Sequence, residues 1–458
     1  MSEGMKNISY QPTDGLSYDP IEEKYWDQKG LAKEVERIFE ICHGCRLCFK
    51  YCDTFPDLFS LIDHKHGGDV RKITPGETEA VLDTCFQCKL CEVSCPYTPR
   101  DHHPYMLDFP KMVHRYRAVR ARSRGIPLRD RVLADPDGTG KLARASFGLA
   151  NVANRLRIHR WFLEKLLGIH RDKLLPDFAS ETFETWANKT GRTTKESAAE
   201  VVLFQTCFVQ NNEPGIGKDT VAVLEKNGVK VRCAKGLRCC GMPAWEKGDL
   251  ATLQAQAKEN LRVLMPFVER GAKVLVINPT CSMMFRREYP ELVAAEDREA
   301  ARKLAAATMD PSEFLWSIRN EVRFNTDFKS APDGAVGYHT PCHLRTQAIG
   351  FKARDLMRKI PGVKPVMVQE CCGHNGTYAM TTAGFEPSKR LGQRAFDGMQ
   401  ETNASVWVTD CPLAALQFQQ HAGVKPMHPM SLLARAYRES GFPRKIEKPK
   451  EQEEGTDS

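Results

Sequence analysis

Two short runs of cysteine constrain this chain more than any other feature of its sequence. The first run is Cys42-His-Gly-Cys45-Arg-Leu-Cys48-Phe-Lys-Tyr-Cys52, and the second is Cys85-Phe-Gln-Cys88-Lys-Leu-Cys91-Glu-Val-Ser-Cys95-Pro96. Both have the spacing C-x2-C-x2-C-x3-C. Cysteines at this spacing let one short loop present three thiolates to three irons of a single [4Fe–4S] cube. The chain around both runs is therefore expected to fold as loops wrapped on metal clusters.

The fourth cysteine of each run predicts how the two runs are paired. In bacterial two-cluster ferredoxins, which this region resembles, the fourth cysteine binds the cluster held by the other run. The ligands expected for one cube are Cys42, Cys45, Cys48 and Cys95, and those for the other are Cys85, Cys88, Cys91 and Cys52. A structural zinc site uses four ligands, typically as two separated pairs, and fits two identical four-cysteine runs poorly.

The remaining cysteines also favour metal binding over disulfides. The chain has 17 cysteines, and its first residues lack the apolar stretch of a secretory signal. No apolar run approaches the ~18 residues of a membrane-spanning helix. We therefore expect a cytoplasmic protein whose thiols stay reduced. With 458 residues, the chain is long enough for several domains with their own cores.

Positive charge is concentrated in one segment. Between Pro104 and Pro176 there are 16 Lys and Arg against 6 Asp and Glu, whereas the whole chain carries +8. Apolar residues recur there at helical spacing: Leu142, Leu149, Val152, Leu156, Leu163, Leu166 and Leu167. Basic residues lie mostly off this stripe: Arg144, Arg155, Arg157, Arg160 and Lys165. Such a helix either docks on an anionic membrane or a partner, or packs on its own domain with a solvated basic face. No recognition motif indicates nucleic acid.

The second half of the chain contains an internal repeat with cysteines at corresponding positions. The first copy has Cys207, Cys239-Cys240-Gly241 and Cys281, and the second has Cys342, Cys371-Cys372-Gly373 and Cys411, offset by 135, 132 and 130 positions. Short apolar runs such as 201–204 alternate with helix-like stretches such as 253–268, which predicts parallel sheets. Ligands gather where loops leave the carboxyl ends of parallel strands. Each copy is therefore expected to bring its four thiols to one metal site.

These repeats resemble the cysteine-rich (CCG) domains of several families. They are the CCG-containing subunit of heterodisulfide reductase, the iron–sulfur subunits of glycolate and lactate oxidation, and the iron–sulfur subunit of anaerobic glycerol-3-phosphate dehydrogenase. The last resemblance covers nearly the whole chain and includes Cys207-Phe-Val-Gln, Cys281-Ser-Met-Met-Phe-Arg-Arg-Glu-Tyr-Pro290 and His339-Thr-Pro-Cys342-His343. It implies an α+β multidomain protein, with an N-terminal all-α ferredoxin-type domain followed by two tandem α/β CCG domains.

We expect five segments. They are a helical ferredoxin domain (1–103), a basic helical connector (104–196), a first CCG domain (197–330), a second CCG domain (331–443) and a disordered charged tail (444–458). The helical type of ferredoxin domain is indicated by an apolar pattern from Leu31 to Ile41 ahead of the first run. A capping box at Thr74-Pro75-Gly76-Glu77 ahead of the second run supports the same fold.

The resemblance implies an electron carrier of anaerobic respiration. Its expected cofactors are two [4Fe–4S] clusters and one or two further iron–sulfur centres in the CCG domains. Electrons would come from a flavin-dependent dehydrogenase partner and go towards membrane quinone. No complete P-loop or dinucleotide fingerprint is present, because Gly138-Thr-Gly140-Lys141 and Gly215-Ile-Gly217-Lys218 fall short of both. We therefore expect a non-catalytic subunit of an oxidoreductase, either free in the cytoplasm or peripheral on the cytoplasmic membrane face.

Two other functions remain open. The fullest CCG pattern supplies a fifth cysteine in each repeat, but those positions here are Met284 and Ala414. A thiol/disulfide reductase of the heterodisulfide-reductase type, using a CCG cluster, is therefore an alternative that the four-thiol repeats support less well. A redox-sensing scaffold is the other alternative. Cys233 belongs to no set and is expected to be a buried core residue, and neither His343 nor His374 is assigned a role.

Overall fold

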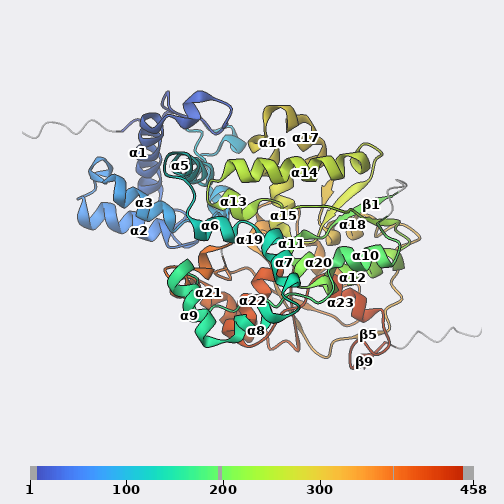
Figure 1. The fold of residues 1–458 in the computed structure, drawn as a ribbon. Coiled ribbons are helices and arrows are strands. Elements are labelled where there is room, and N and C mark those ends of the chain that lie inside the picture. The colour runs from blue at the N-terminus through green and yellow to red at the C-terminus, as the bar shows by residue number, and fades with distance from the viewer. Residues whose placement is uncertain (1–7, 194–198, 375, 447–458) are drawn as a thin grey trace, which may run out of the picture.

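The computed structural model of the protein describes residues 8–193, 199–374 and 376–446. The helices of residues 8–124, blue to teal in Figure 1, lie beside two α/β units coloured green to yellow and orange to red, and the helices of residues 136–189 lie against these two units. The predicted combination of a helical ferredoxin-type region with α/β repeats therefore agrees with the arrangement of the elements. The predicted boundary at residues 196 and 197 lies outside the described residues.

The N-terminal part contains helices and no strands among the described residues up to 193. Its elements are η1 (Glu23–Trp26), α1 (Gln28–Cys45), α2 (Thr54–Ser60), η2 (Leu61–Lys65), η3 (Val70–Lys72), α3 (Pro75–Asp83), α4 (Leu90–Ser94), η4 (Pro99–Asp101), α5 (Phe109–Arg124), α6 (Leu128–Leu133), α7 (Pro136–Ala145), α8 (Leu149–Arg155), α9 (Arg157–Leu167) and α10 (Phe183–Lys189).

The two helices that lead into the cysteine runs begin at strong caps. Asp27 accepts hydrogen bonds from the backbone N–H groups of Lys29 and Gly30, both at 3.0 Å, and starts α1. This helix is longer than expected and carries Cys42 and Cys45 on its last turn. The predicted capping box between Thr74 and Glu77 is present at the start of α3. A capped helix therefore leads into each cysteine run.

Buried arginines hold residues 8–27 on the ferredoxin-type region. Arg37 pairs with Glu34 at 2.6 Å and donates to the Tyr10 and Tyr105 carbonyl oxygens. Arg115 of α5 donates to the carbonyl oxygens of Gly15 and Tyr25 at 2.6 and 2.7 Å. Part of the predicted basic segment is thus internal and serves as a scaffold, because these guanidinium groups satisfy backbone carbonyls.

The first repeat is a parallel sheet with strand order β2-β1-β3-β4. Its strands are β1 (Val201–Phe204), β2 (Val231–Cys233), β3 (Lys273–Val276) and β4 (Thr308–Met309). Its helices are α11 (Thr206–Asn211), α12 (Pro214–Lys226), α13 (Met242–Glu246), α14 (Leu250–Val268), α15 (Pro279–Met283), η5 (Met284–Glu288), α16 (Tyr289–Leu292), η6 (Ala295–Asp297), α17 (Arg298–Ala307) and α18 (Pro311–Ser317).

The second repeat has a parallel sheet of the same topology, with strand order β7-β6-β8. Its strands are β5 (Ser330–Ala331), β6 (Val336–His339), β7 (Pro365–Val368), β8 (Val406–Thr409) and β9 (Arg444–Lys445). Its helices are α19 (Cys342–Arg345), α20 (Lys352–Met357), η7 (Tyr378–Met380), α21 (Phe385–Glu401), α22 (Pro412–Ala422) and α23 (Pro429–Ala436). In both repeats the first long strand is central and the next two flank it, so the duplication seen in the cysteines extends to the sheets.

One hydrophobic core joins the two repeats. Val201 and Leu203 of the first sheet share it with Val336 and Tyr338 of the second. The opposite face of each sheet packs in a separate core, which contains Phe204 in the first repeat and Trp407 in the second. The repeats are therefore fixed against one another by a continuous apolar interior.

The structure adds detail to one predicted segment and differs from another. The predicted helical connector consists of six helices, α5 to α10, separated at residues such as Gly125 and Gly168, which adopt φ of 75° and 61°. The chain also stays ordered past residue 443, because Arg444–Lys445 forms β9 and pairs with β5 of the second repeat. The rest of the predicted tail, 447–458, lies outside the described residues.

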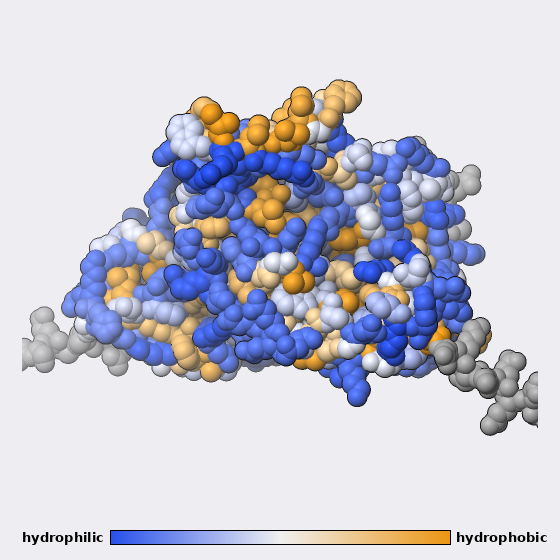
Figure 2. All heavy atoms as spheres, turned by 90° about the horizontal axis from the view of Figure 1, so that it is seen from below, coloured by the Kyte–Doolittle hydropathy of each residue, from blue (hydrophilic) through white to orange (hydrophobic). Residues whose placement is uncertain are grey.

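The apolar stripe of the basic segment faces outward. Leu142, Leu149 and Leu166 are 75%, 69% and 78% exposed, and Phe147 is 97% exposed. Figure 2 shows hydrophobic side chains gathered along one edge of the molecule above a band of hydrophilic residues. Arg160, expected among the solvated basic residues, is instead buried and donates to the His170 and Lys173 carbonyl oxygens. This edge therefore presents unpartnered apolar surface.

Candidate metal centres

The first group of thiols forms at the end of α1. Cys42 and Cys45 lie in its last turn, and Arg46 then adopts a left-handed conformation (φ 54°) that turns the chain towards Cys48. Burial and the neighbouring thiols of Cys48, Cys95 and Cys45 raise the pKa of Cys42 well above its ordinary value. Cys95, from the second run, thus lies with the first three cysteines of the first run, as the reciprocal pairing predicts.

The second group has the same local design. Gln87 and Lys89 are left-handed (φ 52° and 59°) and wrap the loop around the thiols. Burial raises the pKa of Cys91 well above its ordinary value, and the thiols of Cys88, Cys85, Cys48 and Cys52 add to the shift. Burial and the Cys85 thiol raise the pKa of Cys52 to about 12. The loops thus exchange their fourth cysteines, while ligation by these residues stays a prediction.

The first repeat gathers Cys207, Cys239, Cys240 and Cys281 where its strands end. A hydrogen bond with Cys239 and burial raise the pKa of Cys207, whereas hydrogen bonds from Cys207 and Cys240 lower the pKa of Cys239. The turn is held from outside, since Asn260 donates to the Cys239 carbonyl oxygen and Tyr289 to that of Cys240, both at 3.1 Å. Glycine is favoured at position 241, because its φ of 84° is a left-handed conformation that would strain a residue with a side chain.

The second repeat gathers Cys342, Cys371, Cys372 and Cys411 in the same way. Burial raises the pKa of Cys372 well above its ordinary value, and the other three thiols add to the shift. Gln417 of α22 donates to the Cys372 carbonyl oxygen at 3.2 Å. Gly373 (φ 71°) has no room for a side chain, because a Cβ would lie 2.0 Å from the Ser388 carbonyl oxygen. Cys233, as expected, lies outside both sets in the core of the first repeat.

The four groups follow one another in space in an order that differs from their order in the sequence. The Cys48 thiol donates to the Cys91 carbonyl oxygen at 3.8 Å, linking the first and second groups. Cys342 is, after burial, the largest contributor to the raised pKa of Cys88, linking the second group to the second repeat. Cys281 contributes to the raised pKa of Cys411, linking the two repeats. The thiols of the second repeat therefore lie between those of the ferredoxin-type region and those of the first repeat.

Buried ion pairs fix the ferredoxin-type region onto the first repeat. Lys89, between Cys88 and Cys91, pairs with Glu288, and Glu92 pairs with Arg287. The side chains of Lys89 and Glu288 are only 1% and 5% exposed. Both repeat residues belong to the stretch after Cys281 that carried the family resemblance, but sequence reasoning gave them no role. The ion pairs of Arg287 and Glu288 hold the second cysteine run against the first repeat.

His343 is a further contact that sequence reasoning left unassigned. Its Nε2–H donates to the Gln87 carbonyl oxygen at 3.0 Å, and its Nδ1 accepts from the Thr280 hydroxyl at 2.9 Å. These partners adjoin Cys88 and Cys281, and His343 itself follows Cys342. Burial lowers its pKa to about 4, so the ring is neutral and holds one tautomer. His374 is half-buried, and its Nδ1 atom is buried with no hydrogen-bond partner among the described residues.

The residues at these four positions fit iron–sulfur clusters. Crowded, buried thiols resist ionisation, and a bound metal cluster supplies the positive charge that makes them thiolates. Backbone N–H groups also face the sulfurs, from Gln87 to Cys85 at 3.5 Å and from Gly373 to Cys371 at 3.3 Å. Among the described residues no three His, Cys, Asp or Glu side chains converge as ligands of one metal ion. In a cluster each thiolate binds a different iron.

Comparison with known proteins identifies the family. Residues 41–98 match the family model described as 4Fe-4S dicluster domain, and residues 201–286 and 336–419 each match the one described as Cysteine-rich domain. The anaerobic glycerol-3-phosphate dehydrogenase subunit designated C, from Escherichia coli (strain K12), is 30% identical over 311 residues, which cover 68% of this chain and 77% of the relative. The chain belongs to the family of that dehydrogenase subunit. The prediction of an iron–sulfur protein with a ferredoxin-type region and two CCG domains is confirmed.

A second group of relatives matches a shorter part of the chain. Lactate utilization protein A of Bacillus cytotoxicus is 30% identical over 220 residues, which cover 46% of this chain and 87% of the relative. Members of the glycerol-3-phosphate dehydrogenase subunit family carry iron–sulfur clusters for electron transport in an oxidoreductase, and the predicted cofactors agree with the matches. Within the described residues, no helix is both long and apolar enough to cross a membrane.

Proposed function

We propose that this protein passes electrons from a flavin-dependent dehydrogenase partner towards membrane quinone. The iron–sulfur clusters supply reversible one-electron chemistry, and the four cysteine groups are the residues that hold them. The ligand sets are Cys42, Cys45, Cys48 and Cys95; Cys52, Cys85, Cys88 and Cys91; Cys207, Cys239, Cys240 and Cys281; and Cys342, Cys371, Cys372 and Cys411. The chain itself is then a non-catalytic subunit, and its domains follow the predicted boundaries with the end of the last one moved past β9.

The spatial order of the four groups is the observation that carries this proposal. The Cys48 thiol donates a hydrogen bond to the Cys91 carbonyl oxygen, Cys342 helps to raise the pKa of Cys88, and Cys281 helps to raise that of Cys411, so neighbouring groups are close enough to interact. A carrier needs such a continuous series, whereas a scaffold that only senses oxidation does not. The series also has two ends, one in the ferredoxin-type region and one in the CCG repeats. This arrangement favours electron transfer between two different partners.

The ferredoxin-type end has the features of an electron entry point. Cys45 is the exposed member of the cysteine sets, whereas every other cysteine is buried or half-buried. Leu47 and Phe49, in the same loop, are 51% and 61% exposed, and Val93, after the second run's Cys91, is 39% exposed. Apolar side chains around an accessible cluster ligand suit a protein partner. The E. coli relative is named as a dehydrogenase subunit, so we assign this face to the dehydrogenase.

The other end has the features of a membrane-facing acceptor side. Helices α7 to α9, which carry exposed apolar residues, lie on both CCG repeats. Asp137 of α7 accepts from the Cys239 N–H at 2.8 Å, and the Thr382 N–H donates to the carbonyl oxygen of Gly168, at the end of α9, at 2.9 Å. An amphipathic surface of this kind binds the interface of a bilayer. Peripheral attachment would bring the CCG repeats next to quinone dissolved in the membrane.

The proposal is tested by reconstitution. The anaerobically purified protein is mixed with its dehydrogenase and that enzyme's substrate, and bleaching of the iron–sulfur absorption is followed before and after a quinone analogue is added. We expect reduction only with the dehydrogenase, followed by reoxidation by quinone. A chain that reduces disulfides by itself with an artificial donor, and that no dehydrogenase reduces, would support the thiol/disulfide reductase instead.

A further inference from the structure

We propose that the pocket between α9, residues 171–177 and α22 binds the head group of a quinone, with Arg160 as a hydrogen-bond donor to one quinone carbonyl oxygen. This inference rests on the proposed function, because it names the place where the acceptor meets the chain. The pocket has a volume of about 1290 Å³, which is ample for a head group and the first part of an isoprenoid tail.

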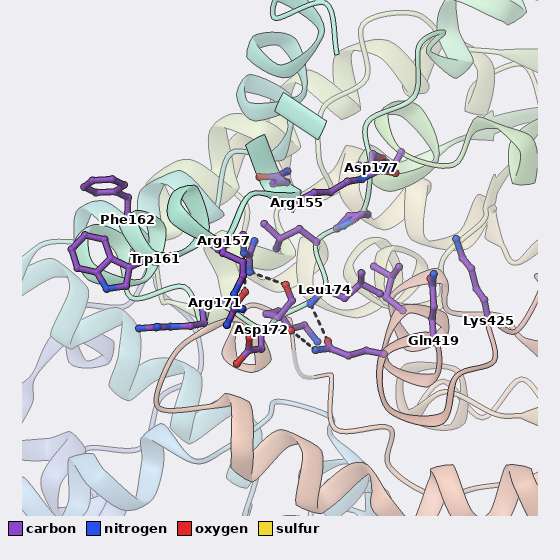
Figure 3. Close-up of a pocket in the computed structure, with 18 of the residues that line it drawn as sticks. Arg155, Arg157, Trp161, Phe162, Arg171, Asp172, Leu174, Asp177, Gln419 and Lys425 are labelled. Atoms are coloured by element: carbon purple, nitrogen blue, oxygen red, sulfur yellow. Dashed lines mark hydrogen bonds and ion pairs between the residues drawn. The ribbon is translucent and has the colours of Figure 1, made fainter. Parts of the chain in front are cut away.

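The pocket lies where the basic segment meets both CCG repeats. Figure 3 shows Trp161 and Phe162 on the α9 side and Gln419 and Lys425 on the α22 side, with Arg157, Arg171, Asp172 and Leu174 between them. Asn212 of the first repeat also lines the pocket. A ligand here would therefore contact all three parts of the chain that follow the ferredoxin-type region.

A short covalent and hydrogen-bonded path joins the pocket to the thiols of the second repeat. Lys173 lines the pocket and donates to the Gln417 side chain, which donates to the Cys372 carbonyl oxygen at 3.2 Å. Leu416 lines the pocket from α22, a helix that begins directly after Cys411. At 1.5 Å per residue, Leu416 is only about 7.5 Å along the helix from Cys411. The acceptor would therefore bind close to a cysteine set.

Arg160 supplies an unused donor at this pocket. Its Nε and Nη2 groups donate to the carbonyl oxygens of Arg171 at 3.0 Å and Lys173 at 2.7 Å, which locks the guanidinium in place. Its Nη1 is buried and has no hydrogen-bond partner among the described residues. A buried donor without a partner is costly, and a ligand carbonyl would satisfy it. The residue is 5% exposed, so this donor is not an ordinary solvated one.

The other charges favour a neutral ligand over an anion. Arg155 pairs with Asp177, Arg171 with Glu164, and Lys425 with Glu213. Most of the positive charge around the pocket is therefore compensated. A quinone has neutral carbonyl oxygens and an apolar tail, and the exposed Ile158, Trp161 and Phe162 offer that tail a route to the membrane-facing edge. A phosphate group would instead need several free cations.

Reduction of a quinone to a quinol at this pocket takes two electrons and two protons. Two electrons leave reduced iron–sulfur clusters one at a time, and the clusters are oxidised. The quinone takes up these electrons together with two protons from water at the open side of the pocket, so its two carbonyl oxygens become hydroxyl groups. Arg160 stabilises the negative charge that develops on one oxygen before it is protonated.

Filling the pocket tests the inference. Gln419→Trp on α22 and Ile158→Trp on α9 place bulk into opposite walls, and Gln400→Trp on the exposed surface of α21 is the matched control. Each protein, with its clusters, is reduced chemically, freed of reductant and mixed with decylubiquinone, and reoxidation is followed by visible absorption. We expect at least a tenfold rise in the quinone concentration for half-maximal rate in both pocket variants and no change in the control. Ferricyanide should reoxidise all four proteins equally.

A binding measurement accompanies the kinetics. A photoreactive azidoquinone should cross-link to peptides from 154–177 or 412–425 in the wild-type protein and lose this labelling in Gln419→Trp. Wild-type kinetics in both pocket variants, or labelling elsewhere, would overturn the pocket. Failure of wild-type protein to pass electrons to any quinone, while ferricyanide oxidises it, would instead overturn the acceptor part of the proposed function.

Discussion

His343 donates a hydrogen bond from Nε2 to the backbone carbonyl oxygen of Gln87 over 3.0 Å, inside the interface between the ferredoxin-type region and the CCG repeats. Gln87 lies between Cys85 and Cys88, and His343 follows Cys342. The same ring accepts from Thr280, which precedes Cys281. One neutral imidazole thus fixes the relative positions of three cysteine loops.

Replacing His343 by leucine is expected to destabilise the protein by about 1–3 kcal/mol, because the buried Gln87 carbonyl and the half-buried Thr280 hydroxyl both lose their hydrogen bond to the imidazole. Electron transfer from the second cysteine group to the second repeat should also slow. His343→Gln retains a donor and should lose less. The measurement is anaerobic chemical denaturation followed by tryptophan fluorescence, with the exposed His64→Gln as a control expected within about 0.5 kcal/mol of wild type. Equal stability of His343→Leu and wild type would contradict this role.

The cysteine sets could be predicted from the sequence because their spacing is local. Each run specifies its loop, and each repeat places its thiols directly after a strand, so Cys207 and Cys342 follow β1 and β6 as expected. The parallel sheets could also be predicted, because each short apolar run is a local pattern. These features depend on neighbours in the sequence and on the carboxyl-end rule for parallel strands.

The order of the groups could not be predicted, because it depends on contacts between distant segments. Nothing in the spacing of Cys88 indicates that it lies near Cys342, or that Lys89 pairs with Glu288. The burial of Arg160 could not be predicted for a related reason. Its place off the apolar stripe predicts a solvated side chain, but Arg160 donates hydrogen bonds to the carbonyl oxygens of the loop that follows α9. Periodicity identifies the faces of a helix, but it does not indicate which other segment packs on them.

The buried ion pair between Lys89 and Glu288 should hold the second cysteine run on the first repeat. Lys89→Met leaves Glu288 charged and buried, which is expected to cost about 3–5 kcal/mol. The double variant Lys89→Met with Glu288→Met should recover most of that loss, because no unpaired charge remains. The exposed pair of Arg124 and Glu79 provides the control, where Arg124→Met should cost under about 1 kcal/mol. A double variant no more stable than Lys89→Met would argue against the pairing.

The ligand sets are tested by iron content. Cys45→Ala should lower the iron bound by about four atoms per chain, because the first cube loses a ligand. Cys372→Ala should also lower iron and remove an electron paramagnetic resonance signal from the second repeat. Cys233→Ala is the matched control, since Cys233 is buried in β2 away from the four sets. Unchanged iron in Cys372→Ala, or loss of iron in Cys233→Ala, would refute the assignment.

Stability should fall as the pH drops below about 6.5, the ordinary pKa of histidine in an unfolded chain. Burial lowers the pKa of His428 to about 4, although its hydrogen bond to the Ile277 carbonyl opposes this shift. The unfolded chain therefore binds a proton more readily than the folded one. The contribution of His428 to the free energy of unfolding is complete above about pH 6.5 and is lost as the pH falls towards 4. At pH 5 the loss is about 2 kcal/mol.

His428→Gln separates this residue from the other buried histidines, such as His114, whose pKa burial also lowers to about 4. The variant should be less stable at pH 7, and its unfolding free energy should decline less steeply between pH 6.5 and 4. Denaturation at several pH values measures both slopes. Parallel slopes for the two proteins would show that His428 does not titrate as its burial requires.

The two ends of the protein should respond to different surface changes. Phe49→Ser removes a 61% exposed side chain beside Cys45, so it should slow reduction by the dehydrogenase about tenfold and leave vesicle binding unchanged. Phe147→Ser removes a 97% exposed side chain beside α7 and should do the reverse, weakening binding to anionic vesicles while the rate of reduction stays the same. Each variant serves as the control for the other, because both replace an exposed phenylalanine by serine. Stopped-flow bleaching and vesicle sedimentation give the two readouts. If both variants weakened the same readout, the two faces would not be separate. If Phe147→Ser alone slowed reduction, the dehydrogenase would dock at the CCG end, and electrons would flow in the opposite direction.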